Sequence, residues 1–324
     1  MLRRSGRRAA TILRTFPRAQ QGRPRCWRSH GGRGVGAEIS RRQFLGTAAA
    51  GGFAAASGAI RAGQEPPAAP APPPRPRCIV DSHVHLKHGD AARTEYTADE
   101  IVHVMDKVGI AKSVVFAMST TTQRSIDMAE KAVSKFPDRL IPYVYALPHY
   151  ERPAIKEIQA ALSGRLFRGV KIHAGECTLA EYVIDPVLAL AGRYRAPCLV
   201  DCKGDHAAAR RMAKAFPGTT LIIAHMGRYL ATDGRLLDQF IGLAAECDNV
   251  LLDVSGVVLV EKIPEAVRTI GAKRLVWGTD GPHPKPDTVA FARTELDKVR
   301  QLDLGEDDKD NLLGRTILEL LRLQ

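Results

Sequence analysis

The strongest constraint on the fold is an alternation between short apolar segments and segments with helical periodicity, which repeats eight times after residue 77. The apolar segments, which we expect to be strands, lie at residues 78–85, 113–117, 140–147, 169–173, 197–201, 220–225, 250–254 and 275–280. Eight strand–helix pairs in about 250 residues are typical of a (β/α)₈ TIM barrel with parallel strands. We therefore predict an α/β fold with a single barrel domain at 78–324, and an open doubly wound sheet is the alternative.

The helix after the first strand has clear signals at both ends. Thr97 and Glu100 have the spacing of a capping box, and Gly109 follows the last apolar position. Later helices are expected at residues 125–135, 154–162, 187–194, 207–215, 236–245 and 263–270, and from the last strand out to residue 323.

The positive charge of the chain lies in its first 76 residues. They contain 14 Lys and Arg residues but only two acidic residues, Glu38 and Glu65, and their net charge of +12 equals that of the whole chain. The remaining residues are electrically balanced, which argues against a nucleic acid as partner. The six cysteines show no C-x-x-C spacing, so neither a disulfide framework nor a cysteine metal site is predicted.

The N-terminal region divides into three segments by composition. Residues 1–39 form a basic extension that is expected to be disordered, and residues 64–77 form a Pro/Ala-rich linker. Between them, Arg41 and Arg42 precede Phe44, Leu45 and an Ala/Gly-rich stretch, so that residues 40–63 resemble a twin-arginine signal peptide. The resemblance implies the twin-arginine translocase as a partner and a periplasmic location. A transmembrane anchor is the alternative, but the segment is short of the about 20 apolar residues that a span takes, and no stable anchor is expected.

Histidines are concentrated where the predicted strands end. The first strand ends in a His-x-His pair, His83 and His85, whose side chains project from the same face because strand residues two apart do so. Eight of the ten histidines lie at or just after a strand-like segment: His83, His85, His88, His149, His173, His206, His225 and His283. In a (β/α)₈ barrel the active site lies at the C-terminal ends of the strands. The pattern therefore predicts one site that uses imidazole groups.

Five motifs, in order along the chain, resemble those of the amidohydrolase superfamily. They are Asp-Ser-His-Val-His-Leu at 81–86, Arg-Gly-Val-Lys-Ile-His at 168–173, Ile-Ile-Ala-His-Met-Gly at 222–227, Asn-Val-Leu-Leu-Asp-Val-Ser at 249–255 and Trp-Gly-Thr-Asp-Gly-Pro at 277–282. The nearest branch is the amidohydrolase-related group (amidohydrolase 2), which contains lactonases, other hydrolases and non-oxidative decarboxylases. The resemblance extends from residue 78 to the C-terminal region.

The resemblance implies a role for each matching residue. His83 and His85 would be metal ligands, and Asp280 would bind metal and accept a proton from water. His225 would orient or polarise the reacting group. A divalent ion lowers the pKa of bound water to about 7, and a neighbouring carboxylate can take the proton during attack. Imidazole and carboxylate ligands suit Zn²⁺, which we expect first, or Mn²⁺.

One position departs from the family pattern. The fifth strand of the family usually ends in a ligand histidine, whereas this chain has Asp201. Asp201 would remain a metal ligand through an oxygen donor, which shifts the preference towards harder ions such as Mn²⁺. The alternative is a weakened or lost metal site, with His206 or His173 as the substitute ligand.

Four further residues are candidates for substrate binding. Lys171 and His173 share one face of the fourth strand, and Lys203 and Arg228 follow the fifth and sixth strands, where they could hold a substrate carboxylate. The alternative for Lys171 and His173 is a structural pair, and the alternative for Lys203 and Arg228 is ordinary surface charge. Asp253 is interpreted as a carboxylate that fixes a loop, and His149 and His283 are interpreted as residues at the rim of the site.

The sequence thus predicts a metal-dependent hydrolase that uses metal-activated water on an ester, lactone or amide bond of a small molecule. A non-oxidative decarboxylase on the same scaffold is the first alternative. A binding protein without catalytic activity, in which Asp201 marks the decay of the site, is the second.

Overall fold

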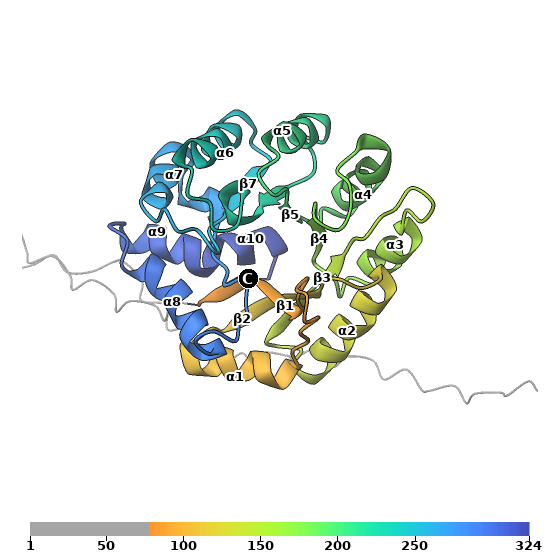
Figure 1. Cartoon of the computed structure of the whole chain (residues 1–324), viewed down its shortest axis with the longest axis horizontal. Helices are drawn as coiled ribbons and strands as arrows, with labels where there is room; N and C mark the ends of the chain where they lie inside the picture. Colours follow the sequence, from red (N-terminus) through yellow and green to blue (C-terminus); the bar gives the residue numbers. More distant parts are fainter. Residues whose placement is uncertain (1–77, 324) are drawn as a thin grey trace, which may run out of the picture. The chain divides into compact units, whose positions relative to one another are not determined.

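The computed structural model describes residues 78–323, and these form a barrel of eight parallel strands (Figure 1). The extension, signal peptide and linker predicted at 1–39, 40–63 and 64–77 lie outside the described residues. The strands are β1 (Val80–Lys87), β2 (Lys112–Ala117), β3 (Leu140–Tyr145), β4 (Gly169–His173), β5 (Cys198–Asp201), β6 (Leu221–Ile223), β7 (Val250–Asp253) and β8 (Leu275–Val276).

Each strand pairs in parallel with the next one along the chain, from β1 to β8. The ring is closed between β1 and the segment that follows β8. Ser82 N donates to the Trp277 carbonyl oxygen at 3.0 Å, and His85 N donates to the Gly281 carbonyl oxygen at 2.7 Å. The predicted (β/α)₈ TIM barrel is therefore confirmed, and the doubly wound sheet is excluded.

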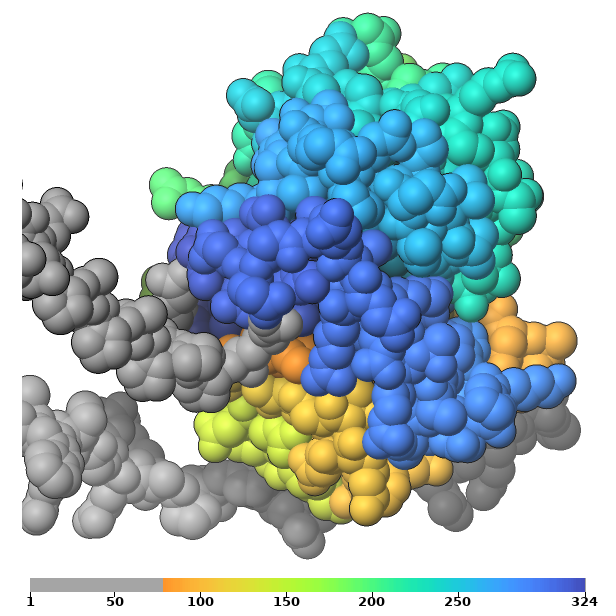
Figure 2. All heavy atoms as spheres, turned by 90° about the vertical axis from the view of Figure 1, so that its left-hand side faces the viewer, coloured from red at the N-terminus to blue at the C-terminus, as the bar shows by residue number. Residues whose placement is uncertain are grey.

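Helices surround the barrel (Figure 1). They are α1 (Ala98–Val108), α2 (Thr122–Lys135), α3 (Ile155–Ser163), α4 (Glu181–Tyr194), α5 (His206–Ala215), α6 (Gly234–Glu246), α7 (Lys262–Ile270), α8 (Thr288–Arg300), α9 (Glu306–Asp310) and α10 (Thr316–Leu321). Short helical turns are η1 (Ala224–Gly227), η2 (Ala272–Arg274) and η3 (Asn311–Arg315). The blue C-terminal segment fills the space between α7 and α1 and completes the helical ring (Figures 1 and 2). None of these helices is long and apolar enough to cross a membrane.

The ends of α1 are those that the sequence predicts. Thr97 and Glu100 form the reciprocal capping box, in which each side chain accepts a hydrogen bond from the backbone N–H of the other residue. The helix ends at Gly109, which has a φ of 85°. This left-handed conformation favours glycine because it has no Cβ.

Two apolar layers hold the barrel together. One lies between the strands and the surrounding helices, and the other fills the barrel interior with side chains such as Phe116, Tyr143 and Leu199. Ile317 and Leu321 of α10 belong to the interior layer, so the C-terminal helix contributes to the core of the barrel. Gly169 makes room for the Tyr143 ring, because a Cβ there would lie 2.4 Å from it.

Strand β8 is shorter than the predicted 275–280, because the chain leaves the sheet after Val276. Trp277 N donates to the Leu312 carbonyl oxygen at 3.0 Å, and Thr279 N donates to Asp81 Oδ1 at 2.9 Å. Asp280 then adopts a left-handed conformation, with a φ of 58°. The segment after Val276 therefore turns towards the mouth of the barrel, where Asp280 contacts His85 of β1.

Candidate metal centre and active site

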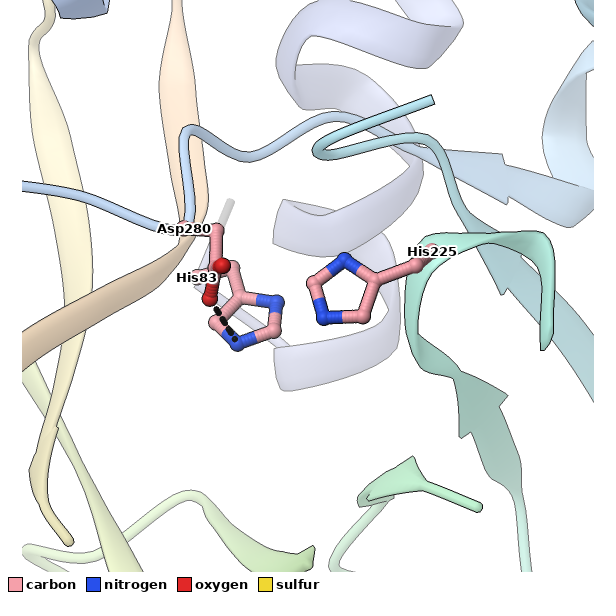
Figure 3. Close-up of side chains that lie close together, drawn as sticks. All are labelled: His83, His225 and Asp280. Atoms are coloured by element: carbon pink, nitrogen blue, oxygen red, sulfur yellow. Dashed lines mark ion pairs between the residues drawn. The ribbon is translucent and has the colours of Figure 1, made fainter. Parts of the chain in front are cut away.

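The candidate site lies at the C-terminal ends of the strands. His83 and His85 are buried on β1, and their side chains share a face. His225 follows β6, and Asp280 follows β8. Figure 3 shows the imidazoles of His83 and His225 and the carboxylate of Asp280 side by side. The structure therefore brings together the first-strand, sixth-strand and eighth-strand residues that the sequence singled out.

The backbone is bent where these side chains enter the site. Lys203, His225 and Asp280 have φ values of 52°, 58° and 58°, and Met226 continues the turn with a φ of 48°. This left-handed conformation costs about 1 kcal/mol or more for a residue with a Cβ, and such strain is concentrated at functional sites. The bends redirect the chain immediately after strands β5, β6 and β8.

Three donor atoms converge. One ligand atom each from His83, His225 and Asp280 lies within 4.8 Å of the other two. Asp280 Oδ1 is 3.1 Å from His83 Nε2 and 2.9 Å from His85 Nε2. His85 thus borders the group of three through the same carboxylate.

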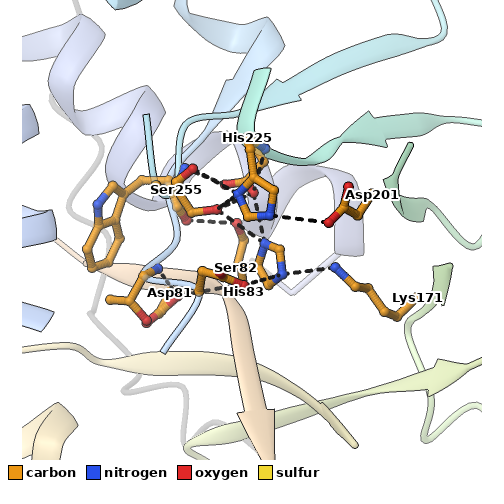
Figure 4. A network of polar contacts seen from close by, with 12 residues as sticks. Asp81, Ser82, His83, Lys171, Asp201, His225 and Ser255 are labelled. Atoms are coloured by element: carbon orange, nitrogen blue, oxygen red, sulfur yellow. Dashed lines mark hydrogen bonds and ion pairs between the residues drawn. The ribbon is translucent and has the colours of Figure 1, made fainter. Parts of the chain in front are cut away.

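The two central imidazoles are held through their outer nitrogens. His83 Nδ1 lies 2.9 Å from Asp253 Oδ2, and His225 Nδ1 lies 2.9 Å from the Ser255 carbonyl oxygen. Ser255 Oγ in turn donates to Asp253 Oδ2 at 2.5 Å. Figure 4 shows this network around His83 and His225. These partners assign the proton to Nδ1 in both rings and leave Nε2 free to bind a ligand.

This arrangement fits a divalent metal ion. A metal-binding histidine usually donates the N–H of one ring nitrogen to a carboxylate or a carbonyl oxygen and binds the metal through the other nitrogen. His83 and His225 have the first of these contacts. Two imidazole nitrogens and a carboxylate oxygen are the donors that Zn²⁺ and Mn²⁺ accept. His83, His225 and Asp280 would hold the ion, with His85 beside them.

The protonation states also suit metal binding. Burial lowers the pKa of both His83 and His85, which favours neutral imidazoles. Burial by itself would raise the pKa of Asp280, but the neighbouring His83 and His225 outweigh it and hold that pKa well below its usual range. Neutral imidazoles and an ionised carboxylate are the forms in which these groups bind metal.

Lys171 introduces a buried positive group into the site. Its side chain is 1% exposed, and its Nζ lies 2.9 Å from His83 Nε2 and 5.0 Å from the centre of the Phe116 ring. Burial lowers the pKa of Lys171, while Asp201 and Asp280 act in the opposite direction. The lysine thus occupies a hydrogen-bonding position at the same nitrogen that a metal ion would use.

Asp201 lies on the other side of His225. Its Oδ2 is 3.1 Å from His173 Nε2 and 3.7 Å from His225 Nε2, and its Oδ1 accepts a hydrogen bond from Lys203 N at 2.8 Å. Burial would raise the pKa of Asp201, but the hydrogen bond with His173 and the charge of His225 hold it low. Asp201 is outside the group of three donors, and its role as a metal ligand stays a prediction. His206 begins α5 and packs against Phe240.

A cavity of about 350 Å³ opens over these residues. Its lining includes Lys171, His173, Asp201 and Lys203, whereas Arg228 is exposed and is not part of this lining. The cavity walls are formed by His85, His88, Gly89, Asp90, Met118, Lys171, His173, Asp201, Lys203, His225, Tyr229 and Asp280.

Sequence reasoning missed several of these wall residues. Tyr229 stacks edge-on against His225 with ring centroids 5.0 Å apart, and His88 stacks on His85 at 4.3 Å. His88 is one of the eight histidines that the sequence places at strand ends, but no individual role was predicted for it; Tyr229 and Met118 carry no signal in the sequence. The His283 side chain is 30% exposed and its Nε2 is 4.0 Å from Asp280 Oδ2, and the interpretation of His283 as a rim residue stays a prediction.

The fold is shared with solved structures that differ widely in sequence. A probable 2-pyrone-4,6-dicarboxylic acid hydrolase from Acinetobacter baumannii, with citric acid bound, is 16% identical with a TM-score of 0.61, over 75% of this chain and 99% of that one. A 5-carboxyvanillate decarboxylase from Sphingomonas paucimobilis is 14% identical with a TM-score of 0.59, over 77% and 100%. A zinc-bound amidohydrolase from Burkholderia multivorans is 14% identical with a TM-score of 0.63, over 76% and 100%. At these identities the likeness establishes the fold alone.

Among curated proteins, none matches this chain in sequence. The sequence profile of the amidohydrolase family does match it, over residues 80–323. The match covers the whole barrel, including the strand ends that carry His83, His225 and Asp280. The chain therefore belongs to the amidohydrolase family.

Proposed function

We propose that this protein is a metal-dependent hydrolase that cleaves an ester, lactone or amide bond in a small molecule. The observation that carries the proposal is the convergence of His83, His225 and Asp280, with both imidazoles oriented through Nδ1 so that their Nε2 atoms face one another and the carboxylate. A bound divalent ion would supply Lewis acidity, which polarises a carbonyl group and acidifies water. Zn²⁺ is the first expectation, and Mn²⁺ is the second.

The residues of the chain supply the remaining functions. Asp280 is an ionised carboxylate at neutral pH because its pKa is held low, and it can accept a proton from the attacking water. His225 lies in the cavity wall, where its imidazole can help to orient the reacting group beside the ion. Burial of these groups strengthens each interaction, because it excludes water.

The cavity favours a small acid as substrate. Lys171, His173 and Lys203 lie along its wall, and lysine side chains can pair with a substrate carboxylate. The names of two solved neighbours support this choice, since one is a hydrolase of a pyrone dicarboxylic acid and another is a carboxyvanillate decarboxylase. With about 350 Å³, the cavity suits a small molecule.

A non-oxidative decarboxylase remains the second candidate. Solved neighbours include 5-carboxyvanillate and 2,6-dihydroxybenzoate decarboxylases, and the same lysine-lined cavity would hold the carboxylate that leaves. Release of CO₂ without uptake of water would identify this reaction.

The test is the metal content of the full chain, purified without chelator, beside the variants His83→Ala and Asp201→Ala. About one equivalent of Zn²⁺ or Mn²⁺ in the parent protein and its loss from His83→Ala would support the site. Loss from Asp201→Ala as well would make Asp201 a ligand. A parent protein that takes up neither ion would overturn the enzymatic proposal and favour a binding protein.

Export by the twin-arginine route is proposed from residues 40–63 alone, with the periplasm as the destination. Replacing both Arg41 and Arg42 by Lys should leave the precursor in the cytoplasm, which cell fractionation would detect. Undiminished export of this double variant would contradict the signal.

A further inference from the structure

A second cavity, of about 590 Å³, lies at the opposite end of the barrel from the metal centre. Its wall includes Arg168, immediately before β4, and Arg195, shortly before β5, so it borders the N-terminal ends of these strands. Arginine dominates the wall, which carries Arg165, Arg168, Arg193, Arg195 and Arg322.

Among residues 78–323, these five arginines have no acidic partner. Some other arginines of the barrel are paired, as Arg210 is with Glu246 at 2.9 Å and Arg211 is with Asp185 at 2.7 Å, whereas single exposed arginines such as Arg235 are not. What distinguishes the five is that they surround one cavity. Within residues 78–323, no ion pair involves any of the five, and no carboxylate lines the cavity. Five like charges around one hollow repel one another, so an anion in the hollow would be strongly favoured.

Three of the five arginines occupy backbone positions that disfavour them. Arg165, Arg195 and Arg322 follow α3, α4 and α10 with φ values of 59°, 51° and 56°. At the ends of α1 and α7 the chain places Gly109 and Gly271 in positive-φ conformations instead, as is usual. A positive side chain near a helix C-terminus is stabilising in general, but that alone does not require the left-handed residue itself to be arginine.

The rest of the wall defines the kind of anion. Apolar and aromatic side chains, including Phe167, Tyr194 and Leu320, lie among the arginines. Guanidinium groups match the geometry of phosphate oxygens and can bind them in pairs of hydrogen bonds. The volume of the cavity lies within the range of small-molecule pockets and is larger than a single phosphate ion needs.

We propose that this cavity binds an organic phosphate that carries at least two negative charges, with the phosphate groups on the arginines and the organic part against Tyr194 and Leu320. The site is separate from the metal centre and does not depend on the reaction proposed above. The phosphate could belong to a soluble metabolite or to a lipid headgroup, and the chemistry of recognition is the same for both.

The test compares two double variants of the full chain, purified with its native C-terminus. Arg165→Gly/Arg195→Gly removes two cavity charges and also relieves two left-handed positions. Arg235→Ala/Arg268→Ala removes two exposed charges from α6 and α7 and serves as the control with matched charge. Binding of pyrophosphate is measured by calorimetry and by the shift of the thermal unfolding midpoint, with chloride added to equal ionic strength.

We expect saturable binding of pyrophosphate to the parent protein and to the control, and an affinity at least about tenfold lower in the cavity variant, because charge-assisted hydrogen bonds are lost. Equal affinities in the two double variants would overturn the proposal, since the basic residues elsewhere would then account for binding. Absence of saturable binding to the parent protein, together with absence of vesicle binding, would also overturn it.

A sedimentation assay with phosphatidylglycerol vesicles distinguishes the two sources of phosphate. Cosedimentation that the cavity variant loses and pyrophosphate displaces would assign the phosphate to a lipid headgroup. Pyrophosphate binding without cavity-dependent cosedimentation would assign it to a soluble ligand.

Discussion

The two ends of the barrel handle charge in opposite ways. At the C-terminal ends of the strands, charged and polar groups contact partners of complementary character, as Asp253 does with His83 and Asp201 with His173. At the N-terminal ends of β4 and β5, five arginines surround a cavity to whose wall residues 78–323 contribute no carboxylate. One end therefore has a network of paired charges, whereas at the other end the described residues leave the positive charge of the cavity unpaired, which is why we propose an anion there.

The difference means that one end of the barrel would select its ligand by the positions of donor atoms and the other by charge. In the candidate metal centre, hydrogen bonds to Asp253 and to the Ser255 carbonyl fix the orientation of each imidazole, so that geometry would decide which ion fits. In the arginine cavity, exposed guanidinium groups provide a field of one sign, so that charge decides which ligand enters. Variants at each end should accordingly change different measurements.

The largest expected effect is loss of catalysis in Asp280→Asn. The amide cannot accept the proton that the ionised carboxylate accepts, and it is a weaker metal ligand, so we expect kcat/KM to fall by about a thousandfold or more. Asp303→Asn, on an exposed turn, is the control and should behave as the parent protein. Retention of more than about a tenth of the activity would exclude Asp280 as the base.

A smaller loss, of metal affinity, is expected for Asp253→Asn, which leaves the proposed ligands His83, His225 and Asp280 in place. Its carboxylate orients His83 through Nδ1 at 2.9 Å, and the loss of such a partner typically weakens metal binding by about 10–100-fold. Competition with a chelator measures the affinity, and Asp248→Asn, at the surface, provides the control. An unchanged affinity would show that packing alone holds the His83 ring.

Lys171→Met should change metal affinity in the other direction. In the parent protein the ion must displace the Lys171 ammonium from His83 Nε2, so removing this hydrogen bond should raise the affinity by about tenfold. Lys203→Met removes the same charge from the cavity wall without a contact to His83 and should have little effect. A decrease in affinity for Lys171→Met would show instead that the lysine side chain contributes to holding the ion.

The smallest effect is expected at the other end of the barrel. Arg195→Gly relieves a left-handed residue and reduces repulsion among like charges, so the free energy of unfolding should rise by about 1 kcal/mol in the absence of an anion. Urea unfolding would show this as a higher midpoint with an unchanged slope. Arg195→Ala keeps the strained backbone and should gain less; a larger gain for Ala than for Gly would refute the explanation by strain.

Much of the fold follows from local patterns in the sequence. Apolar runs and helical periodicity located all eight strands and the helices around them, because burial of one face imposes these periods. The boundaries were less accurate. The helix predicted at 187–194 begins at Glu181 and contains Pro186, and the strand predicted at 275–280 ends at Val276, because contacts with distant segments decide these limits.

The sequence could predict those site residues whose side-chain type, histidine or aspartate, itself indicates metal binding or proton transfer. His83, His85 and His225 were singled out by the positions of histidines at strand ends, and Asp280 by the resemblance to the amidohydrolase motifs; the structure brings these side chains together. The contact between Lys171 and His83 and the position of Tyr229 depend on the packing of separate strands and loops. The arginine cavity was missed because its members come from the ends of three different helices, where single arginines are unremarkable.

The closure of the barrel has a consequence for the order in which the protein forms. His85 and Asp280 are 195 residues apart in the chain, and the last strand and α10 complete the surroundings of the first strand. During synthesis, β1 therefore emerges long before the segments that pair with its free edge and cover its end. The candidate metal centre cannot assemble until almost the entire barrel has been made, so a chain that is truncated near its C-terminus should be unable to form it.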